Sequence, residues 1–350
     1  GIKMNSITPI EFKDNLLILI DQRKLFETEE YFVCDTVESV HFAIKDMVVR
    51  GAPAIGVAAG YGMYIKALSL KDTDIKSFKK SMKKTADYLD TARPTAVNLF
   101  YATKRMMDVV DNLSGTVTKP DEIITALYKE AVAIHNEDIK ANKEIGKNML
   151  SLLKNAKSVL TVCNAGILAT TAYGTATSAM YLAKEQGREL SVYACETRPR
   201  LQGARLTSYE LNKNGVDVTV ITDGMVAHLM SKKMVDAFIA GCDRVAANGD
   251  TANKIGTKGI SIIAKRYNIP VYIACPTSTI DMNVKDGSGI VIEERDPSEV
   301  THIGGVRIVP EGVKVFNPSF DVTDHEDITA IVTEKGIAYP PFSETLKLLK

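Results

Sequence analysis

Cysteine is scarce in this 350-residue sequence, and its five copies follow no pattern that would pair them. They are Cys34, Cys163, Cys195, Cys242 and Cys275, an odd number spread along the chain without a CxxC pair. Disulfide frameworks and structural zinc sites need paired or closely spaced cysteines, so neither is predicted. We expect reduced thiols, a cytoplasmic location and no metal site.

Long apolar runs and an excess of charge are also missing. The longest apolar run near the start, NLLILI, is far shorter than the roughly 20 residues that span a bilayer, and no segment resembles a secretory signal. Lys and Arg number 43, as do Asp and Glu, so the formal net charge is zero. This balance argues against nucleic acid or a membrane as a partner. The remaining composition, 45% apolar and 25% charged, is that of a globular protein of about two domains.

Two hydrophobic patterns divide the chain. In the first part, apolar residues recur at three- and four-residue spacing, as in VESVHFAIKDMVVR and AVNLFYATKRMMDVVDNL, which predicts helices. LLILI and YFVC predict short strands before them. In the second part, short apolar runs such as SVLTVC, VDAFIAGC and PVYIAC alternate with helical stretches at 170–186, 203–214, 225–233 and 251–267.

Strands that are apolar on both faces and alternate with helices predict a parallel sheet covered on both sides. We therefore predict an α/β fold, with a mostly helical N-terminal domain carrying a small antiparallel sheet (1–130), followed by a Rossmann-like doubly wound parallel-sheet domain (131–350). No GxGxxG motif opens the second domain, so a dinucleotide is not implied, and we expect no cofactor.

Polar residues that follow the predicted strands are the candidates for chemistry, because ligands of open α/β sheets bind at the carboxyl ends of the strands. Cys163 ends the run SVLTVC, and the start of a helix behind it would stabilise a thiolate. A lone cysteine is more often a buried space-filler, so that alternative stays open. Cys195, Cys242 and Cys275 lie in strand patterns, and we predict structural roles for them.

Asp243 follows the run VDAFIAGC and would stand at the mouth of the sheet. Apolar walls there raise the pKa of a carboxyl group enough for it to act as an acid. The commoner role of an aspartate after a strand is an ordinary loop carboxylate or a helix cap.

Two stretches of the helical part suggest phosphate binding. In RGAPAIG, Arg50 precedes Gly51 and Ala52, whose N–H groups are free to face a ligand, and Pro53 suits the first turn of a helix. In TARPTAVN, Arg93 precedes a second helix that we expect to begin at the proline. A tight junction of small residues would explain RGAPAIG equally well.

The stretch NGDTANKIGT adds a third cation. Asp250 or Thr251 would cap a helix with Asn253 and Lys254 in its first turn, where a lysine opposes the helix dipole unless an anion is bound. A solvated lysine is the alternative. Two arginines, a lysine and several helix N-termini together favour a phosphate ligand more than any one of them alone.

These stretches, taken in order over nearly the whole chain, resemble the methylthioribose-1-phosphate isomerase family. The specific ones are RGAPAIG, ARPTAVNL, CNAGILATTAYGTA, ACETRPRLQGARLTSYEL, DRVAANGDTANKIGT and IEERDP. The resemblance implies that the protein is a homodimer. It also implies that the protein binds a small-molecule sugar phosphate. It also implies the roles of the site residues: phosphate binding by Arg50, Gly51, Ala52, Arg93 and Lys254, sugar contacts by Gln202 and Asn253, proton donation by Asp243, and Cys163 as the second catalytic group.

The implied reaction converts 5-methylthioribose 1-phosphate to 5-methylthioribulose 1-phosphate in methionine salvage. The phosphate on C1 locks the ring, so a general acid such as Asp243 would have to protonate the ring oxygen and open it. Afterwards either a proton leaves C2 or a hydride passes from C2 to C1, and the sequence leaves both routes open.

Two alternatives remain. One is an isomerase of 5-deoxyribose 1-phosphate or ribose 1,5-bisphosphate, which would need only a different pocket around C5. The other is a non-enzymatic regulatory subunit of a translation-initiation exchange factor, built on the same fold. The presence of both Cys163 and Asp243 argues against the second.

Overall fold

The computed structural model describes residues 7–350, which form two compact units. The helical unit comprises Ile7–Ala141 and Ile167–Gly174, and the sheet unit comprises Asn142–Gly166 and Thr175–Lys350. Helix α5 (Asp121–Leu152) begins in the helical unit and ends in the sheet unit. Within the described chain, every helix is too short or too polar to cross a membrane.

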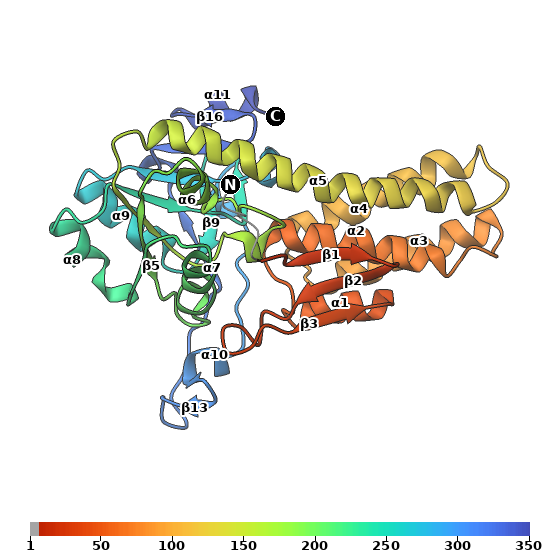
Figure 1. Ribbon diagram of the computed structural model, residues 1–350, viewed down its shortest axis with the longest axis horizontal. Helices are drawn as coiled ribbons and strands as arrows, with labels where there is room; N and C mark the ends of the chain where they lie inside the picture. Colours follow the sequence, from red (N-terminus) through yellow and green to blue (C-terminus); the bar gives the residue numbers. More distant parts are fainter. Residues whose placement is uncertain (1–6) are drawn as a thin grey trace. The chain divides into compact units, whose positions relative to one another are not determined.

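The helical unit is built around one central helix, α2 (Ala52–Leu68) (Figure 1). Its sequence is small and apolar on all sides, and every residue from Ala54 to Ile65 is buried, as expected for a helix without a polar face. Glycines let its neighbours approach closely: a Cβ atom on Gly56 would lie 3.2 Å from the carbonyl oxygen of Asn98, and one on Gly62 would lie 2.9 Å from Cγ1 of Val40.

The other elements of this unit surround α2. A three-stranded antiparallel sheet contains β1 (Ile10–Lys13), β2 (Leu16–Ile20) and β3 (Tyr31–Cys34) in that order. Helices α1 (Val37–Lys45), α3 (Ile75–Asp90), α4 (Val97–Ser114) and the first part of α5 complete it. The apolar pattern predicted a helix as far as Arg50, but α1 ends at Lys45 because Met47 adopts a φ of 59°.

The sheet unit contains a seven-stranded sheet in the order β16-β15-β10-β7-β4-β5-β6. Its strands are β4 (Ser158–Thr161), β5 (Ser191–Cys195), β6 (Val218–Ile221), β7 (Ala237–Ala240), β10 (Val271–Ala274), β15 (Ala330–Thr333) and β16 (Gly336–Ala338). All neighbours are parallel except β15 and β16. The chain enters at the middle, winds outward to β6 and returns beside β4, which is the doubly wound order.

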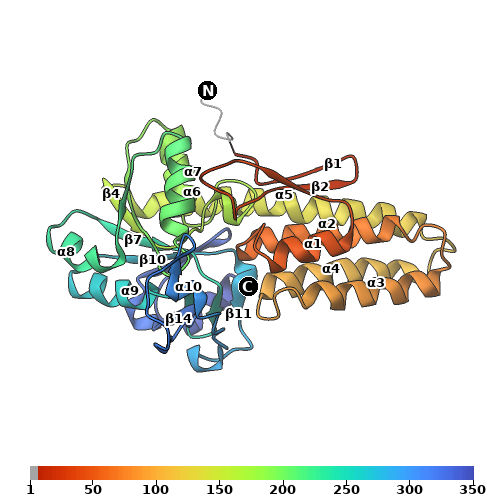
Figure 2. The same cartoon turned by 90° about the horizontal axis from the view of Figure 1, so that it is seen from below.

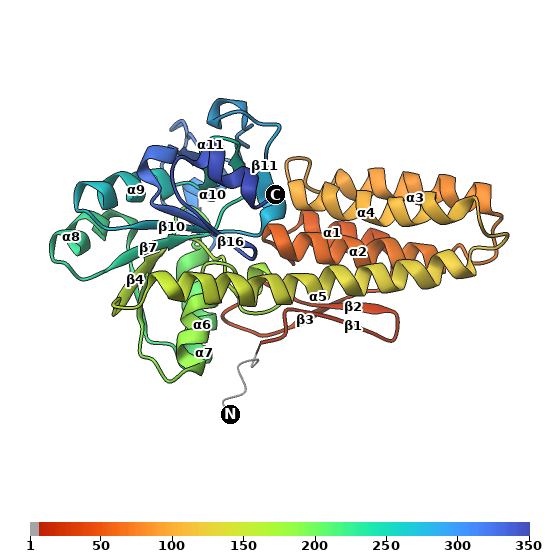
Figure 3. The same cartoon turned by 90° about the horizontal axis from the view of Figure 1, so that it is seen from above.

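Helices cover both faces of this sheet. Figures 2 and 3 show α6 (Ser178–Glu185) and α7 (Ser208–Lys213) on one side and α9 (Thr257–Arg266) on the other. Every residue of β7, β10 and β15 is buried. The predicted fold class, a helical part with a small sheet followed by a doubly wound parallel sheet, is therefore confirmed.

Two predicted helices are wrong in their first halves. The stretch expected from Thr170 becomes helical only at Ser178, after a series of turns. The stretch expected from Thr251 begins as strand β9 (Thr251–Lys254), which lies between β8 (Arg244–Ala246) and β14 (Phe320–Thr323) in a second sheet with β11 (Ile280–Asp281). Pairing on both edges of β9 outweighs its local helix signal, and α9 starts only after Gly256.

Candidate active site

Two predicted catalytic residues follow the two strands that flank the reversal of the sheet order. β5 and β6 lie beyond β4 on one side, and β10 and β15 lie beyond β7 on the other. Doubly wound sheets leave a crevice outside the carboxyl ends of the strands at such a reversal. Only Val162 separates β4 from Cys163, and only Gly241 and Cys242 separate β7 from Asp243.

The loops behind these two strands are in direct contact. A Cβ atom on Gly241 would lie 2.6 Å from the Cβ of Ala165 and 3.3 Å from the Oγ1 of Thr175. Glycine is required at 241 because any side chain there would push apart the loops that carry Cys163 and Asp243.

Hydrogen bonds join the ends of three adjacent strands beneath Cys163. The Cys163 N–H donates to the Oγ1 of Thr197 (2.8 Å), and that hydroxyl donates to the carbonyl oxygen of Cys195 (3.0 Å). The Asp223 carboxylate, after β6, accepts the N–H groups of Thr197 (2.9 Å) and Arg198 (2.8 Å). Cys163 and Thr197 have φ values of 59° and 65°, a conformation that costs about 1–3 kcal/mol per residue and clusters at functional sites.

The expected helix start behind Cys163 is absent from the described residues, and that prediction is wrong. The chain instead makes a turn and a short 3₁₀ segment, Ile167–Ala169. The side chain of Cys163 is half-buried. Burial raises the pKa of Cys195 to about 12, and a hydrogen bond with Cys275 together with burial raises the pKa of Cys242 well above its usual value. These values agree with structural roles for Cys195 and Cys242.

Asp243 is attached to the strand that carries Asn253 and Lys254. Its N–H donates to the carbonyl oxygen of Ala252 (2.9 Å), the neighbour of Asn253. Asn253 is buried, and its amide donates to the Oγ1 of Thr257 (3.0 Å). Because successive strand residues leave on opposite faces, Lys254 extends away from Asn253, with its Nζ 5.2 Å from the ring centre of Phe320.

The expected placement of Lys254 in the first turn of a helix is therefore wrong. Asp250 caps no helix either: its carboxylate accepts the N–H groups of Gly287 (2.9 Å) and His325 (2.9 Å) and the amide of Asn248 (3.0 Å). Because Lys254 lies in a strand, no helix dipole opposes its charge, and its phosphate-binding role is implied by the family resemblance alone.

Gln202 lies beyond β5, directly before a π-helical segment, Gly203–Thr207, that leads into α7. Such segments recur at functional sites. Gln202 is 7% exposed, and its Oε1 is one of few buried side-chain atoms in residues 7–350 without a hydrogen-bond partner. An unpaired buried amide oxygen is costly, so this atom fits a donor on a ligand, such as a sugar hydroxyl.

In the helical unit, Gly51 caps α2 with a φ of 97°. A Cβ atom there would lie 2.6 Å from atoms of Ala169, so only glycine fits. No side chain caps α2, its first turn carries no acidic residue, and Pro53 lies in that turn as predicted. The N-terminus of α2, with Arg50 before it and Ala52 at its first position, suits an anion.

Arg93 precedes the neighbouring helix, but not as predicted. α4 begins at Val97 rather than at Pro94, because residues 93–96 form a turn closed by the Ala96 N–H on the Arg93 carbonyl oxygen (3.0 Å). The close approach of Gly56 to Asn98 sets the first turns of α2 and α4 side by side. The structure therefore brings the starts of both helices together within this unit.

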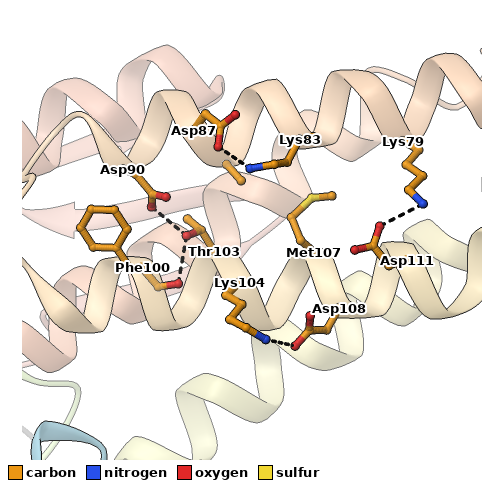
Figure 4. Close-up of a pocket in the computed structure, with 11 residues that line it drawn as sticks. Lys79, Lys83, Asp87, Asp90, Phe100, Thr103, Lys104, Met107, Asp108 and Asp111 are labelled. Atoms are coloured by element: carbon orange, nitrogen blue, oxygen red, sulfur yellow. Dashed lines mark hydrogen bonds and ion pairs between the residues drawn. The ribbon is translucent and has the colours of Figure 1, made fainter. Parts of the chain in front are cut away.

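A pocket of about 610 Å³ lies between α3 and α4 (Figure 4), and none of the predicted site residues lines it. Its lysines are paired with aspartates, so it presents no net field for an anion: Lys83 with Asp87 (2.6 Å), Lys104 with Asp108 (3.0 Å) and Lys79 with Asp111 (3.3 Å). No cluster of three or more His, Cys, Asp or Glu side chains suited to a metal occurs in residues 7–350.

Comparison with known proteins identifies relatives over the whole chain. Residues 48–340 match the family described as the Initiation factor 2 subunit family. The 5-deoxyribose 1-phosphate isomerase of Clostridium botulinum is 56% identical over 349 residues, covering 99% of each chain. The crystal structure of 5-methylthioribose 1-phosphate isomerase from Pyrococcus horikoshii OT3 superposes with a TM-score of 0.93 at 41% identity, covering 99% of this chain and 96% of that one.

A third relative has a different description. The crystal structure of the translation initiation factor eIF-2B, subunit delta, from A. fulgidus matches with a TM-score of 0.87 and 43% identity, over 98% of this chain and 99% of that one.

The hydroxyl of Thr197 provides a test of the hydrogen bonds that join the strand ends beneath Cys163. In Thr197→Val the shape is kept, but the Cys163 N–H and the Cys195 carbonyl lose their partner, which costs about 1–3 kcal/mol. We expect a lower free energy of unfolding in urea, followed by circular dichroism, while Thr197→Ser stays near the wild type. Equal stability of the valine variant and the wild type would show that the hydroxyl does not hold the loop.

Proposed function

This chain belongs to the Initiation factor 2 subunit family, and from that premise we propose that it is an isomerase that converts a five-carbon aldose 1-phosphate into the ketose 1-phosphate. The observation that carries the proposal is that Cys163 and Asp243 follow β4 and β7, the strands on either side of the reversal of the sheet order. The expectations of a homodimer and of a cytoplasmic location are part of the same proposal.

The first candidate substrate is 5-deoxyribose 1-phosphate. A relative of that description is 56% identical to this chain, against 41% for the methylthioribose 1-phosphate isomerase structure. The sequence motifs by themselves favour the methylthio sugar, and the higher identity to the 5-deoxyribose 1-phosphate isomerase corrects that order. The methylthio sugar stays the second candidate because the structure of that relative superposes so closely. The two sugars share the phosphate, ring and hydroxyls and differ only by a methylthio group on C5.

The proposed roles follow from the chemistry of a locked sugar. Asp243 protonates the ring oxygen, the bond between C1 and that oxygen breaks, and positive charge develops at C1. In the hydride route, hydrogen moves with its electron pair from C2 to C1, and the proton on the C2 hydroxyl returns to the Asp243 carboxylate. In the enol route, Cys163 as thiolate takes the C2 proton and later gives it to C1, while Asp243 again receives the hydroxyl proton. Both routes regenerate the starting enzyme.

Binding is assigned to the remaining residues. The phosphate is held by cations and by N–H groups at helix starts, assigned to Arg50, Gly51, Ala52, Arg93 and Lys254. The unpartnered Oε1 of Gln202 accepts a sugar hydroxyl, and Asn253 holds a second polar group. The C1 phosphate does not change its charge during the reaction, so these contacts stabilise the ground and transition states alike.

A regulatory subunit is the second candidate function, favoured by the 43% identity to the initiation factor structure. A subunit that only binds another protein has no use for an acid and a thiol at the mouth of the sheet. Cys163 and Asp243 are both present, so we rank the enzyme first.

Substrate turnover tests the function directly. The purified chain, without added metal or nicotinamide, should form a ketose from 5-deoxyribose 1-phosphate. Because a small apolar group changes binding by about 1–3 kcal/mol, we expect the methylthio sugar to be used with a kcat/KM about 10–200-fold lower. The opposite ranking would make the methylthio sugar the substrate. No ketose from either sugar, together with binding to an initiation factor, would establish the regulatory subunit.

Replacing the two catalytic groups should stop chemistry without unfolding the protein. Cys163→Ser and Asp243→Asn should each lower kcat by about 100-fold or more, with an unchanged circular dichroism spectrum. Cys242→Ala, which removes the thiol next to Asp243, serves as the control and should retain wild-type turnover. If Cys163→Ser turned over like the wild type, Cys163 would return to a structural role.

Loss of a phosphate-binding cation should have a different effect. Arg93→Ala and Lys254→Ala should mainly raise KM, because phosphate binding is uniform along the reaction. Lys104→Ala removes the same charge from the exposed surface of α4 and should leave both constants unchanged. A fall in kcat at constant KM would mean that the cation acts in the transition state instead.

Deuterium on C2 distinguishes the two routes. A sheltered pocket disfavours separated charge, so we expect hydride transfer, and the product should keep the label on C1 after many turnovers in ordinary water, as read by NMR. Complete loss of deuterium would exclude the hydride route and make Cys163 the base at C2.

A further inference from the structure

Glu210, on α7, is a fully buried carboxylate that the proposed mechanism does not use. It is 0% exposed, and glutamate is almost never fully buried unless it is paired. Its Oε1 accepts the hydroxyl of Tyr181 on α6 (2.7 Å), and its Oε2 accepts the side-chain amide of Asn164 (2.9 Å). Asn164 is the residue directly after Cys163.

The carboxylate also lies against the far end of the same turn. A Cβ atom on Gly166 would be 2.0 Å from Oε1 and 2.4 Å from Oε2 of Glu210, so the group packs onto the glycine backbone. Thr207, just before α7, completes the contact: its hydroxyl donates to the carbonyl oxygen of Cys163 (2.5 Å) and accepts the amide of Asn164 (3.1 Å). The segment from Thr207 to Glu210 thus contacts both ends of the turn Cys163–Gly166.

Both side-chain partners of Glu210, Asn164 and Tyr181, donate hydrogen bonds to it. The amide nitrogen of Asn164 can only donate. Burial and the charge of Glu210 raise the pKa of Tyr181 well above its usual value, so the phenol keeps its proton and donates as well. Each side-chain oxygen of Glu210 therefore accepts a hydrogen bond. Replacing buried polar groups by well-packed apolar side chains of similar volume is often neutral or stabilising, so the place of Glu210 beneath the Cys163 turn calls for a reason besides stability.

We propose that Glu210 is a positioning residue for the reaction: by binding Asn164 and packing on Gly166, it fixes the turn that aims the Cys163 thiol. The inference rests on the proposed function, in which Cys163 is catalytic. Cys163 has a φ of 59°, a conformation that is unfavourable for a residue with a side chain. Without the contacts to Glu210, we expect the turn to relax away from this conformation. A displacement of the order of 1 Å at a reacting group lowers a rate by about 100-fold.

Three variants test this role. Glu210→Gln keeps the shape but replaces one acceptor by an NH₂ group, which either faces the donating amide of Asn164 or forces the Tyr181 hydroxyl to accept instead of donate, so the hold on the turn is weakened. We expect kcat to fall by about 10–100-fold and KM to change by less than about threefold, since phosphate binding is uniform. Asn164→Ala breaks the same link from the other side, and the double variant should lose no more than the worse single variant, because the two act as one unit.

Tyr181→Phe is the matched control, because it removes the hydrogen bond to Oε1 of the same carboxylate and leaves the bond between Oε2 and Asn164 in place. It should lower Tm and leave kcat within about twofold of the wild type, since the link to Asn164 remains. If Glu210→Gln lowered Tm but kept kcat, or if Tyr181→Phe lowered kcat as much as Glu210→Gln, Glu210 would be structural and the proposal would be overturned.

A second measurement separates this proposal from the choice of reaction. Alkylation of Cys163 by iodoacetamide, followed by mass spectrometry of its peptide, reports the placement of the thiol without any sugar. Glu210→Gln and Asn164→Ala should change the rate by about fivefold or more, and Tyr181→Phe should not. Unchanged rates in all three would refute the positioning role, whereas changed rates in a chain that forms no ketose would refute only the proposed reaction.

Discussion

The side-by-side pairing of β4 and β7 is the constraint on which the site depends. β4 is the first strand of the large sheet, and the chain completes two further strands before β7 pairs with its other edge. Helices that connect to the two halves of the sheet must leave in opposite directions, which opens a crevice at one place. The loops that meet there need Gly241 at their contact, and they present a thiol from one strand and a carboxyl group from the other.

Much of this architecture is readable from the sequence because it depends on local patterns. LLILI is strand β2 from its first residue to its last, and SVLTVC and PVYIAC mark β4 and β10 to within two residues. Strands buried on both faces leave an unbroken apolar run, and long amphipathic helices leave a clear period. The apolar pattern fails for Thr251–Lys254, where pairing with β8 and β14 decides the structure. Of these two strands, β14 is distant in the sequence.

The candidate site was predictable only in part, for a similar reason. The positions of Cys163 and Asp243 at the strand ends were predictable because each lies at the end of an apolar run, and a residue in that position has a known place in a parallel sheet. The burial of Glu210 could not be predicted, because nothing in the local sequence LTSYEL distinguishes a buried glutamate from a solvated one. The roles of Thr197 and Asp223 depend on hydrogen bonds between the ends of three different strands, which no local pattern encodes.

The bonds beneath Cys163 have a consequence for the order in which this protein becomes functional. Cys163 and Thr197 are 34 residues apart, and Thr197 and Asp223 are 26 apart, so their link exists only when β4, β5 and β6 have assembled. A short peptide with the same sequence would have no reason to hold two side-chain-bearing residues at positive φ. The thiol thus acquires its orientation late, only after the three strands have been built into the sheet.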